Sequence, residues 1–151
     1  MTGNLLLGSA AVLVNLAIQV LAIVGLISFF VQRIETGKVH LSLKTDLRLL
    51  SLVILILFIG HLLQALTWAL IFVWLGEFEN MQTAYYHSLV NLTSLGYGDI
   101  VMSEKRRLLG AMEAANGVLM FGLSAGSMLS VMNRMFASHV ESRYGRTPPR
   151  E

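Results

Sequence analysis

The chain has 151 residues, of which 55% are apolar and 13% charged, and its mean hydropathy is +0.67. This composition is too apolar and too poor in charge for a soluble domain of this length, so we predict an all-α membrane protein. The formal net charge is only +2, and the absence of cysteine excludes a disulfide framework and thiolate metal sites.

Three runs, 5–31, 49–75 and 108–132, are long and apolar enough to cross a membrane as helices. The first run has no basic region before it and exceeds the roughly 15 residues of a signal-peptide core, so we expect it to be a retained helix. Asn15 and Gln19 lie one helical turn apart on this helix. Such a pair predicts a hydrogen-bonded contact between helices, worth about 1 kcal/mol.

Residues 33–48 are predicted to form a basic loop before the second span. On that span His61, Gln64 and Trp68 fall at i, i+3 and i+7, so all three face one direction on a helix. An ionisable residue at membrane depth is a candidate functional group, and the alternative is a neutral histidine hydrogen-bonded to a neighbouring helix. Trp68 and Trp74, toward one end of the span, are typical of a membrane interface.

Asn80 is a suitable cap for a short helix over 81–92, which at about 1.5 Å per residue covers only about half of the hydrocarbon core. A Gly-Tyr-Gly-Asp run follows at 96–99. Its two glycines allow backbone angles that would clash with a side chain, so the carbonyls of the run can all point to one side. We therefore predict a re-entrant loop, because irregular backbone at membrane depth must be covered by protein or water.

The third span is predicted to start near Ser103 and Glu104 and is rich in small residues, including a GxxxG spacing from Gly122 to Gly126. Small residues allow close approach of helices in lipid. The end of the chain, 137–151, is expected to be a short disordered tail.

The basic residues predict the orientation. Eight of the eleven Lys and Arg residues lie in the first loop or from Arg134 onward, whereas three lie at 105–107. The positive-inside rule then places the N-terminus outside, the first loop and C-terminus in the cytoplasm, and the glycine run facing outward. We expect an integral protein of the plasma (inner) membrane.

The run Thr93-Ser94-Leu95-Gly96-Tyr97-Gly98-Asp99 resembles the signature of potassium channels, whose usual form is Thr-Thr-Val-Gly-Tyr-Gly-Asp. The resemblance covers about 49–134, as an outer helix, a pore helix, a selectivity filter and an inner helix. It implies a fourfold homotetramer that conducts K⁺ passively, with no enzymatic activity and no organic cofactor. The segments it implies are an extra N-terminal transmembrane helix (1–32), the basic cytoplasmic loop (33–48), the pore domain (49–136) and the cytoplasmic tail (137–151).

Carried over by position, the resemblance implies a filter made by the backbone carbonyls of five residues, with K⁺ bound at the first four: Ser94, Leu95, Gly96, Tyr97 and Gly98. It further implies filter support or an outer-mouth position for four residues: Thr93, Asp99, Glu113 and His87. Serine and leucine replace the family's usual threonine and valine. The brace behind the filter must also differ, because tyrosine and histidine stand where the family often has tryptophan.

Glu113 is expected near the depth of the filter, where a buried carboxylate needs a partner. The candidates are His87, Tyr86, Asn91 and Trp68. One hypothesis is a filter brace whose protonation affects conduction, and the other is a satisfied hydrogen bond between helices. Gly117 lies near the position of the family's hinge glycine and is a candidate gating hinge.

Other functions stay open on the sequence alone. The altered Ser94-Leu95 pair favours a weakly selective monovalent cation channel. A non-conducting pore-like membrane subunit is a second alternative, and the first helix could recruit an additional membrane partner. A membrane enzyme or metal transporter using His61, His87 and Glu113 is the least favoured, because no tight ligand spacing such as HExxH is present. Voltage gating is not expected, since no span carries arginines at three-residue spacing.

Overall fold

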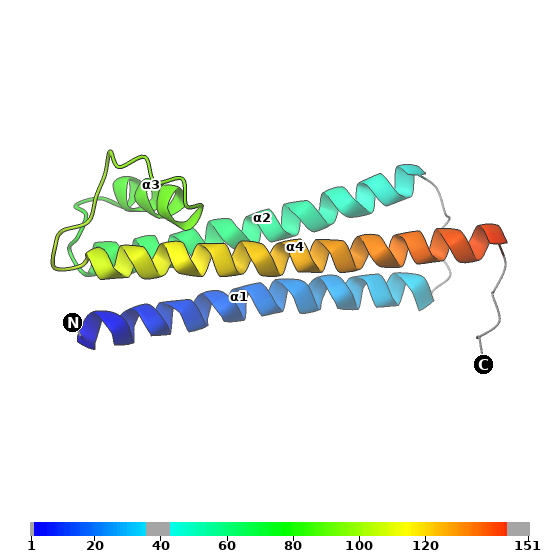
Figure 1. Cartoon of the computed structure of the whole chain (residues 1–151), viewed down its shortest axis with the longest axis horizontal. Coiled ribbons are helices and arrows are strands. Elements are labelled where there is room, and N and C mark those ends of the chain that lie inside the picture. Colours follow the sequence, from blue (N-terminus) through cyan, green and yellow to red (C-terminus); the bar gives the residue numbers. More distant parts are fainter. Residues whose placement is uncertain (1, 36–42, 145–151) are drawn as a thin grey trace.

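The computed structural model describes residues 2–35 and 43–144, and its regular elements are four helices. They are α1 (Thr2–Glu35), α2 (Leu43–Trp74), α3 (Met81–Leu92) and α4 (Arg107–Tyr144). The three long helices run side by side, and short α3 lies at one end of the bundle, against α2 and α4 (Figure 1). This is the predicted order of two spans, a half-length helix and a third span.

The three predicted spans are confirmed by length and composition, at Thr2–Phe29, Lys44–Trp74 and Arg107–Ala137. Two boundaries differ from the prediction. Helix α2 already begins at Leu43, so the end of the predicted basic loop is helical, and α4 continues to Tyr144, so the start of the predicted tail is helical and not disordered. No glycine or proline interrupts the chain between Gly126 and Gly145, so nothing local stops α4 earlier. The rest of the loop and of the tail lies outside the described residues.

The start of α3 is capped as predicted. The Asn80 side-chain oxygen accepts a hydrogen bond from the Thr83 backbone N–H at 2.8 Å. The predicted start of the third helix is slightly early, because a turn precedes Arg107. Ser103 instead donates its backbone N–H and its hydroxyl to the Glu77 carboxylate, which joins the two ends of the loop around α3.

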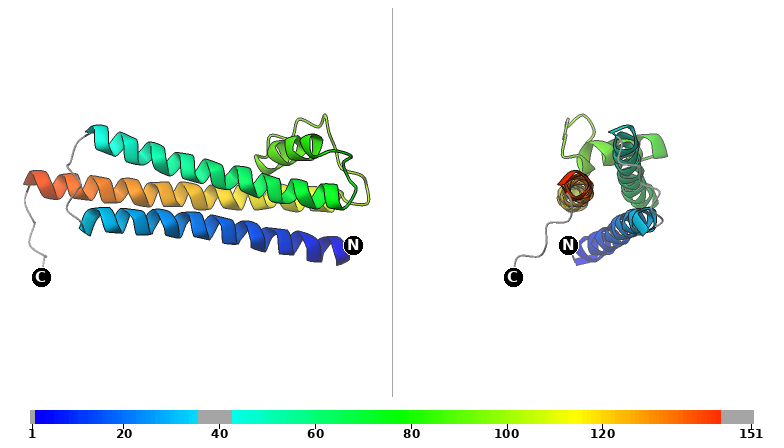
Figure 2. Two further views of the ribbon diagram at one scale, coloured as in Figure 1. Left: turned by 180° about the vertical axis from the view of Figure 1, so that it is seen from behind. Right: turned by 90° about the vertical axis from the view of Figure 1, so that its right-hand side faces the viewer.

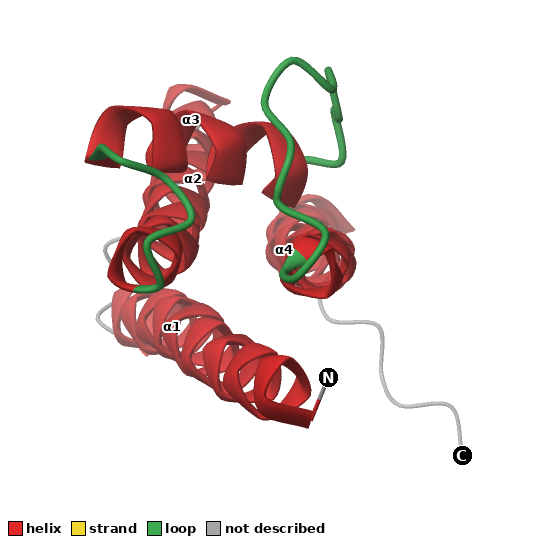
Figure 3. Ribbon diagram, turned by 90° about the vertical axis from the view of Figure 1, so that its left-hand side faces the viewer, coloured by secondary structure: helices red, strands yellow, loops and turns green. Residues whose placement is uncertain are grey.

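Helix α1 packs along both α2 and α4, on the side of the bundle away from α3 and the loop that follows it (Figures 2 and 3). Its N-terminal end is fixed near the start of α4, since Asn4 Nδ2 donates to the Lys105 carbonyl at 2.7 Å. Helix α1 is therefore an integral part of this fold. It lies on the opposite side of α2 and α4 from α3 and the loop that follows α3.

A closed ring of four buried polar side chains joins the three long helices. Gln64 of α2 donates to Gln19 of α1 at 2.9 Å, and Gln19 donates to the Ser124 hydroxyl of α4 at 2.9 Å. His61 closes the ring, with Nδ1 3.2 Å from Gln64 Oε1 and Nε2 3.0 Å from Ser124 Oγ. Because Gln64 Oε1 can only accept, Nδ1 carries the ring proton and Nε2 accepts from the Ser124 hydroxyl. Each of these four residues then donates to the next.

The ring settles two sequence hypotheses. Gln19 makes the predicted contact between helices, and His61 is hydrogen-bonded to a neighbouring helix. Asn15 is also fully buried, yet its amide has no hydrogen-bond partner among the described residues. Trp68 was predicted at a membrane interface but is fully buried, in an apolar cluster with Ala65 and Phe72. Burial on the packed face of α2 explains the difference.

We predict that Ser124→Ala lowers the free energy of unfolding by about 1 kcal/mol, because it leaves the Gln19 amide and His61 Nε2 without their shared partner in an apolar setting. Reversible unfolding in mixed micelles measures the change. Ser127→Ala is the matched control, since the Ser127 hydroxyl bonds the Leu123 carbonyl of its own helix at 2.7 Å. Equal stability of the two variants would contradict a role of the ring in holding the bundle.

Candidate functional site

The sign of φ alternates along the backbone after α3. Ser94, Gly96 and Gly98 have positive φ angles of 59°, 59° and 74°, whereas the intervening Leu95 and Tyr97 do not. Glycine at two of these three positions allows a positive φ without a side-chain clash, so that the carbonyls of the run can point to one side. The segment 94–98 thus has the backbone pattern expected for a row of carbonyl ligands.

Ser94 adopts this conformation although it is not glycine, which costs about 1–2 kcal/mol. The conformation is held by hydrogen bonds to the end of α3. Ser94 N–H donates to the Asn91 carbonyl at 2.9 Å, and the N–H groups of Leu95 and Gly96 both donate to the Val90 carbonyl. These contacts satisfy carbonyls that any helix leaves unpaired at its C-terminus, so α3 and the segment 94–98 fix each other.

A close contact seats the C-terminal end of α3 on α4. A Cβ atom built at Gly117 would overlap the Leu92 backbone carbonyl, so only glycine fits at this position. Beside this seat, Asn91 Nδ2 donates to the Gly110 carbonyl and to Glu113 Oε2, both at 2.7 Å. The contact accounts for a glycine at 117, and its predicted role as a gating hinge stays a prediction.

Glu113 is fully buried and lies within reach of two of its four predicted partners. Its Oε2 accepts the Asn91 hydrogen bond and lies 4.0 Å from His87 Nε2. His87 Nδ1 lies 3.1 Å from the Ile100 carbonyl, so Nδ1 carries a proton and donates. His87 is outside the three candidate spans, and burial lowers the pKa of its imidazole, which leaves the ring uncharged at neutral pH.

A second contact fastens the far end of the segment. The Tyr86 hydroxyl of α3 donates to Asp99 Oδ2 at 2.7 Å, and this hydrogen bond raises the pKa of the Tyr86 phenol. Asp99 Oδ1 also accepts the Ile100 backbone N–H at 3.0 Å. Tyr86 therefore partners Asp99 and not Glu113, and the segment 94–98 is held to α3 at both of its ends.

The outer surface of the segment is uncovered in a single chain. The side chains of Leu95 and Tyr97 are 54% and 66% exposed, although both are large and apolar or aromatic. Behind the segment, between α3 and the start of α4, lies a cavity of about 260 Å³ bordered by His87, Gly96 and Gly110, among others. The site is thus packed on one side and open on the other.

The structure brings together the predicted residues of the loop and its support: 94–98, Thr93, Asp99, His87 and Glu113. Thr93 supports the end of α3, since its hydroxyl donates to the Leu89 carbonyl at 2.7 Å. His61 does not join them, because it belongs to the polar ring. Among residues 2–35 and 43–144, no group of three or more His, Asp or Glu side chains could hold a metal ion.

Sequence reasoning did not assign Tyr86 to Asp99 and did not single out Asn91 as the principal partner of Glu113. Both residues lie on α3, where helical spacing turns Asn91 toward α4 and Tyr86 toward the returning loop. The sequence did offer a signal for Asn91, because it is a polar residue on the last turn of a short helix with a predicted cap.

Comparison with known proteins agrees with this geometry. A family model described as "Ion channel" matches residues 53–134. The chain is also 31% identical over 103 residues to the potassium voltage-gated channel subfamily A member 2 of Oncorhynchus mykiss. That alignment covers 66% of this chain but 21% of the relative, so the chain spans about a fifth of that protein. No solved structure matches the chain significantly.

We predict that Gly117→Ala lowers the free energy of unfolding by about 1–3 kcal/mol, because the new methyl group forces α3 away from α4. Thermal unfolding of the purified protein in detergent measures the loss. Gly60→Ala is the control, since a Cβ at Gly60 of α2 meets nothing within 4 Å. A Gly117→Ala protein as stable as Gly60→Ala would contradict the close seating of α3.

Proposed function

The chain belongs to the ion channel family, and we propose that four copies of it form a potassium-selective pore that conducts K⁺ passively. The observation that carries the proposal is the alternating backbone of Ser94, Gly96 and Gly98. Carbonyl oxygens arranged in this way replace the hydration shell of a permeant cation. The proposed ligands are the carbonyls of the segment 94–98, which we name the filter. The proposed permeant ion is K⁺.

Two further features support a cation over an anion. The C-terminal end of α3 carries the negative end of the helix dipole and directly precedes the filter. Asp99 stands at the other end, where its carboxylate also holds the Tyr86 hydroxyl. Negative potential at both ends of a carbonyl row concentrates cations at the pore mouths.

The geometry of a carbonyl cage supports an assembly of several copies. One chain supplies one strand of carbonyls, whereas a dehydrated cation needs ligands from several directions, which cyclic symmetry provides. The exposed Leu95 and Tyr97 side chains are the surfaces that neighbouring copies would cover. We propose a fourfold homotetramer with the filter strands around its axis.

Potassium is proposed as the cargo because the sequence Gly96-Tyr97-Gly98-Asp99 is kept and because the relative described above is named as a potassium channel. A weakly selective monovalent cation channel is the second candidate. It is favoured by the Ser94-Leu95 pair, which replaces the usual Thr-Val of the resemblance. Serine retains a hydroxyl and leucine an apolar side chain at these positions.

The proposed supporting roles follow the contacts. Thr93 supports the end of α3 that precedes the filter, and Asp99 holds the far end of the filter to Tyr86. Glu113 of α4 accepts a hydrogen bond from Asn91 of α3, and His87 of α3 donates to the Ile100 carbonyl of the loop after the filter. We further propose that the N-terminus and filter face outward and the C-terminus lies in the cytoplasm of a plasma-membrane protein, following the distribution of basic residues. The hinge role of Gly117 belongs to the same proposal.

Potassium flux into liposomes tests the proposal. We expect barium-sensitive K⁺ uptake by the wild type, a reversal potential that follows the K⁺ gradient, and loss of flux in Gly96→Ala, since a side chain at φ 59° disrupts the filter backbone. Gly76→Ala is the matched control, because Gly76 has φ 67° outside the filter and a Cβ there meets nothing within 4 Å. Equal flux in the two variants would refute the assignment, and a reversal potential indifferent to K⁺ over Na⁺ would favour the second candidate.

The Tyr86–Asp99 contact generates a separate prediction. Tyr86→Phe removes the donor that fastens Asp99, so the filter loosens and the K⁺/Na⁺ permeability ratio falls below that of the wild type. Bi-ionic reversal potentials measure the ratio. Tyr85→Phe is the control, because the Tyr85 hydroxyl donates to the Leu62 carbonyl of α2, away from the filter. Unchanged selectivity in Tyr86→Phe would show that this contact does not brace the pore.

A further inference from the structure

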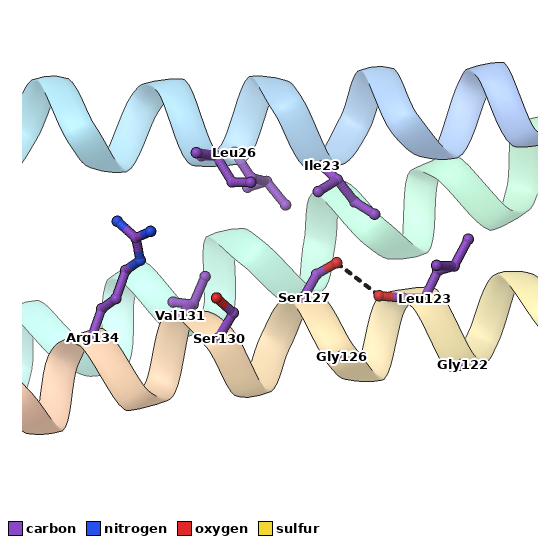
Figure 4. Close-up of a pocket in the computed structure, with 10 residues that line it drawn as sticks. Ile23, Leu26, Gly122, Leu123, Gly126, Ser127, Ser130, Val131 and Arg134 are labelled. Carbon is purple, nitrogen blue, oxygen red and sulfur yellow. Dashed lines mark hydrogen bonds between the residues drawn. The ribbon is translucent and has the colours of Figure 1, made fainter.

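A groove of about 410 Å³ runs between α1 and α4 on their half away from α3. Ile23 and Leu26 of α1 point toward α4, and Arg134 extends from α4 toward α1 at one end of the groove (Figure 4). The groove lies beside the candidate spans and outside the filter, and the residues proposed for conduction do not line it.

Glycine creates the space along α4. A Cβ at Gly122 or Gly126 would meet nothing within 4 Å, so the α4 wall is bare backbone where α1 could otherwise pack. The floor is apolar, since Leu26 and Val131 are buried in a cluster between the helices. Ser127 also borders the groove, but its hydroxyl is bonded to the Leu123 carbonyl of its own helix.

Arg134 gives the groove a charged end. Its side chain is exposed, and among the residues whose side chains the structure describes, no acidic residue lines the groove and no carboxylate forms an ion pair with it. Arg134 lies three residues before the end of the candidate span Arg107–Ala137. Basic residues near the end of a span are typical of the headgroup level. A guanidinium without a partner among these carboxylates is complementary to a phosphate.

The length of the groove matches one leaflet. From Gly122 to Arg134 the rise of α4 is about 18 Å, and one leaflet contributes about 15 Å to the hydrocarbon core. An acyl chain lying along α4 would therefore extend from the headgroup level at Arg134 to about the middle of the bilayer.

We propose that this groove binds an anionic phospholipid, with one acyl chain against Gly122 and Gly126 and its phosphate on Arg134. The lipid completes the packing between the extra helix and α4 on the half of the bundle where α1 and α4 leave a space. The site depends on membrane insertion alone and not on the proposed conduction, so its binding test and the flux assay can fail independently.

Native mass spectrometry of the delipidated full-length protein tests whether the charge of Arg134 selects an anionic headgroup. The titrants are phosphatidylglycerol and phosphatidylcholine with the same acyl chains. We expect the wild type to bind phosphatidylglycerol about fivefold more tightly than phosphatidylcholine, as one basic residue near a membrane surface provides. Arg134→Gln should abolish the preference and Arg134→Lys should retain it. A preference that survives in Arg134→Gln would overturn the assignment, and so would a wild type without one.

A second pair of variants tests the groove itself. Gly126→Leu fills it and should weaken binding of both lipids, whereas Gly25→Leu adds the same side chain to α1 in open space outside the groove and should bind like the wild type. Undiminished binding in Gly126→Leu would refute the site. A change of oligomer mass in Gly126→Leu with unchanged lipid binding would likewise refute it and assign the groove to a contact between copies. Because Arg134 is exposed, its variants keep the proposal testable even if Gly126→Leu fails to fold.

Discussion

Irregular backbone inside a membrane bundle depends on one constraint, namely that its polar groups find partners within the protein. Here the partners come from the end of α3. The carbonyls that close this helix accept hydrogen bonds from successive N–H groups of the segment that follows, and this holds Ser94 in a left-handed conformation. The position of α3 is in turn set by Gly117, which lets the Leu92 carbonyl rest on α4. The geometry of the segment 94–98 is therefore decided by where α3 and α4 touch.

The polar ring also fixes the relative position of helices, at a level of the bundle farther from α3. Apolar side chains give little direction to helix association in lipid, because the surrounding acyl chains are equally apolar. A ring in which each member donates to the next closes here because its members lie at one level of the three helices, so it opposes a shift of one helix along the others. It fixes α1 against both α2 and α4. His61 must be neutral for each member of the ring to donate to the next, because its Nδ1 donates to Gln64 while its Nε2 accepts from Ser124.

The sequence predicted those features that depend on residues close to one another along the chain. Long apolar runs defined the spans, Asn80 and the length of 81–92 defined the half-length helix, and the paired glycines indicated an unusual backbone. Contacts that depend on the register of distant helices could not be predicted. Ser124 looks like any other small residue of its helix until Gln19, 105 residues away, is placed beside it. The partner of Asp99 was likewise hidden by the path of the loop that returns past Tyr86.

The length of α4 has a mechanical consequence. Its 38 residues span about 57 Å, well beyond the roughly 30 Å of a hydrocarbon core. From the seat at Gly117 to Tyr144 the helix forms an arm of about 40 Å, and a tilt of about 10° at the seat would sweep its far end through about 7 Å. A small force applied to the far end of this arm would thus act with long leverage on the contact between α4 and the end of α3.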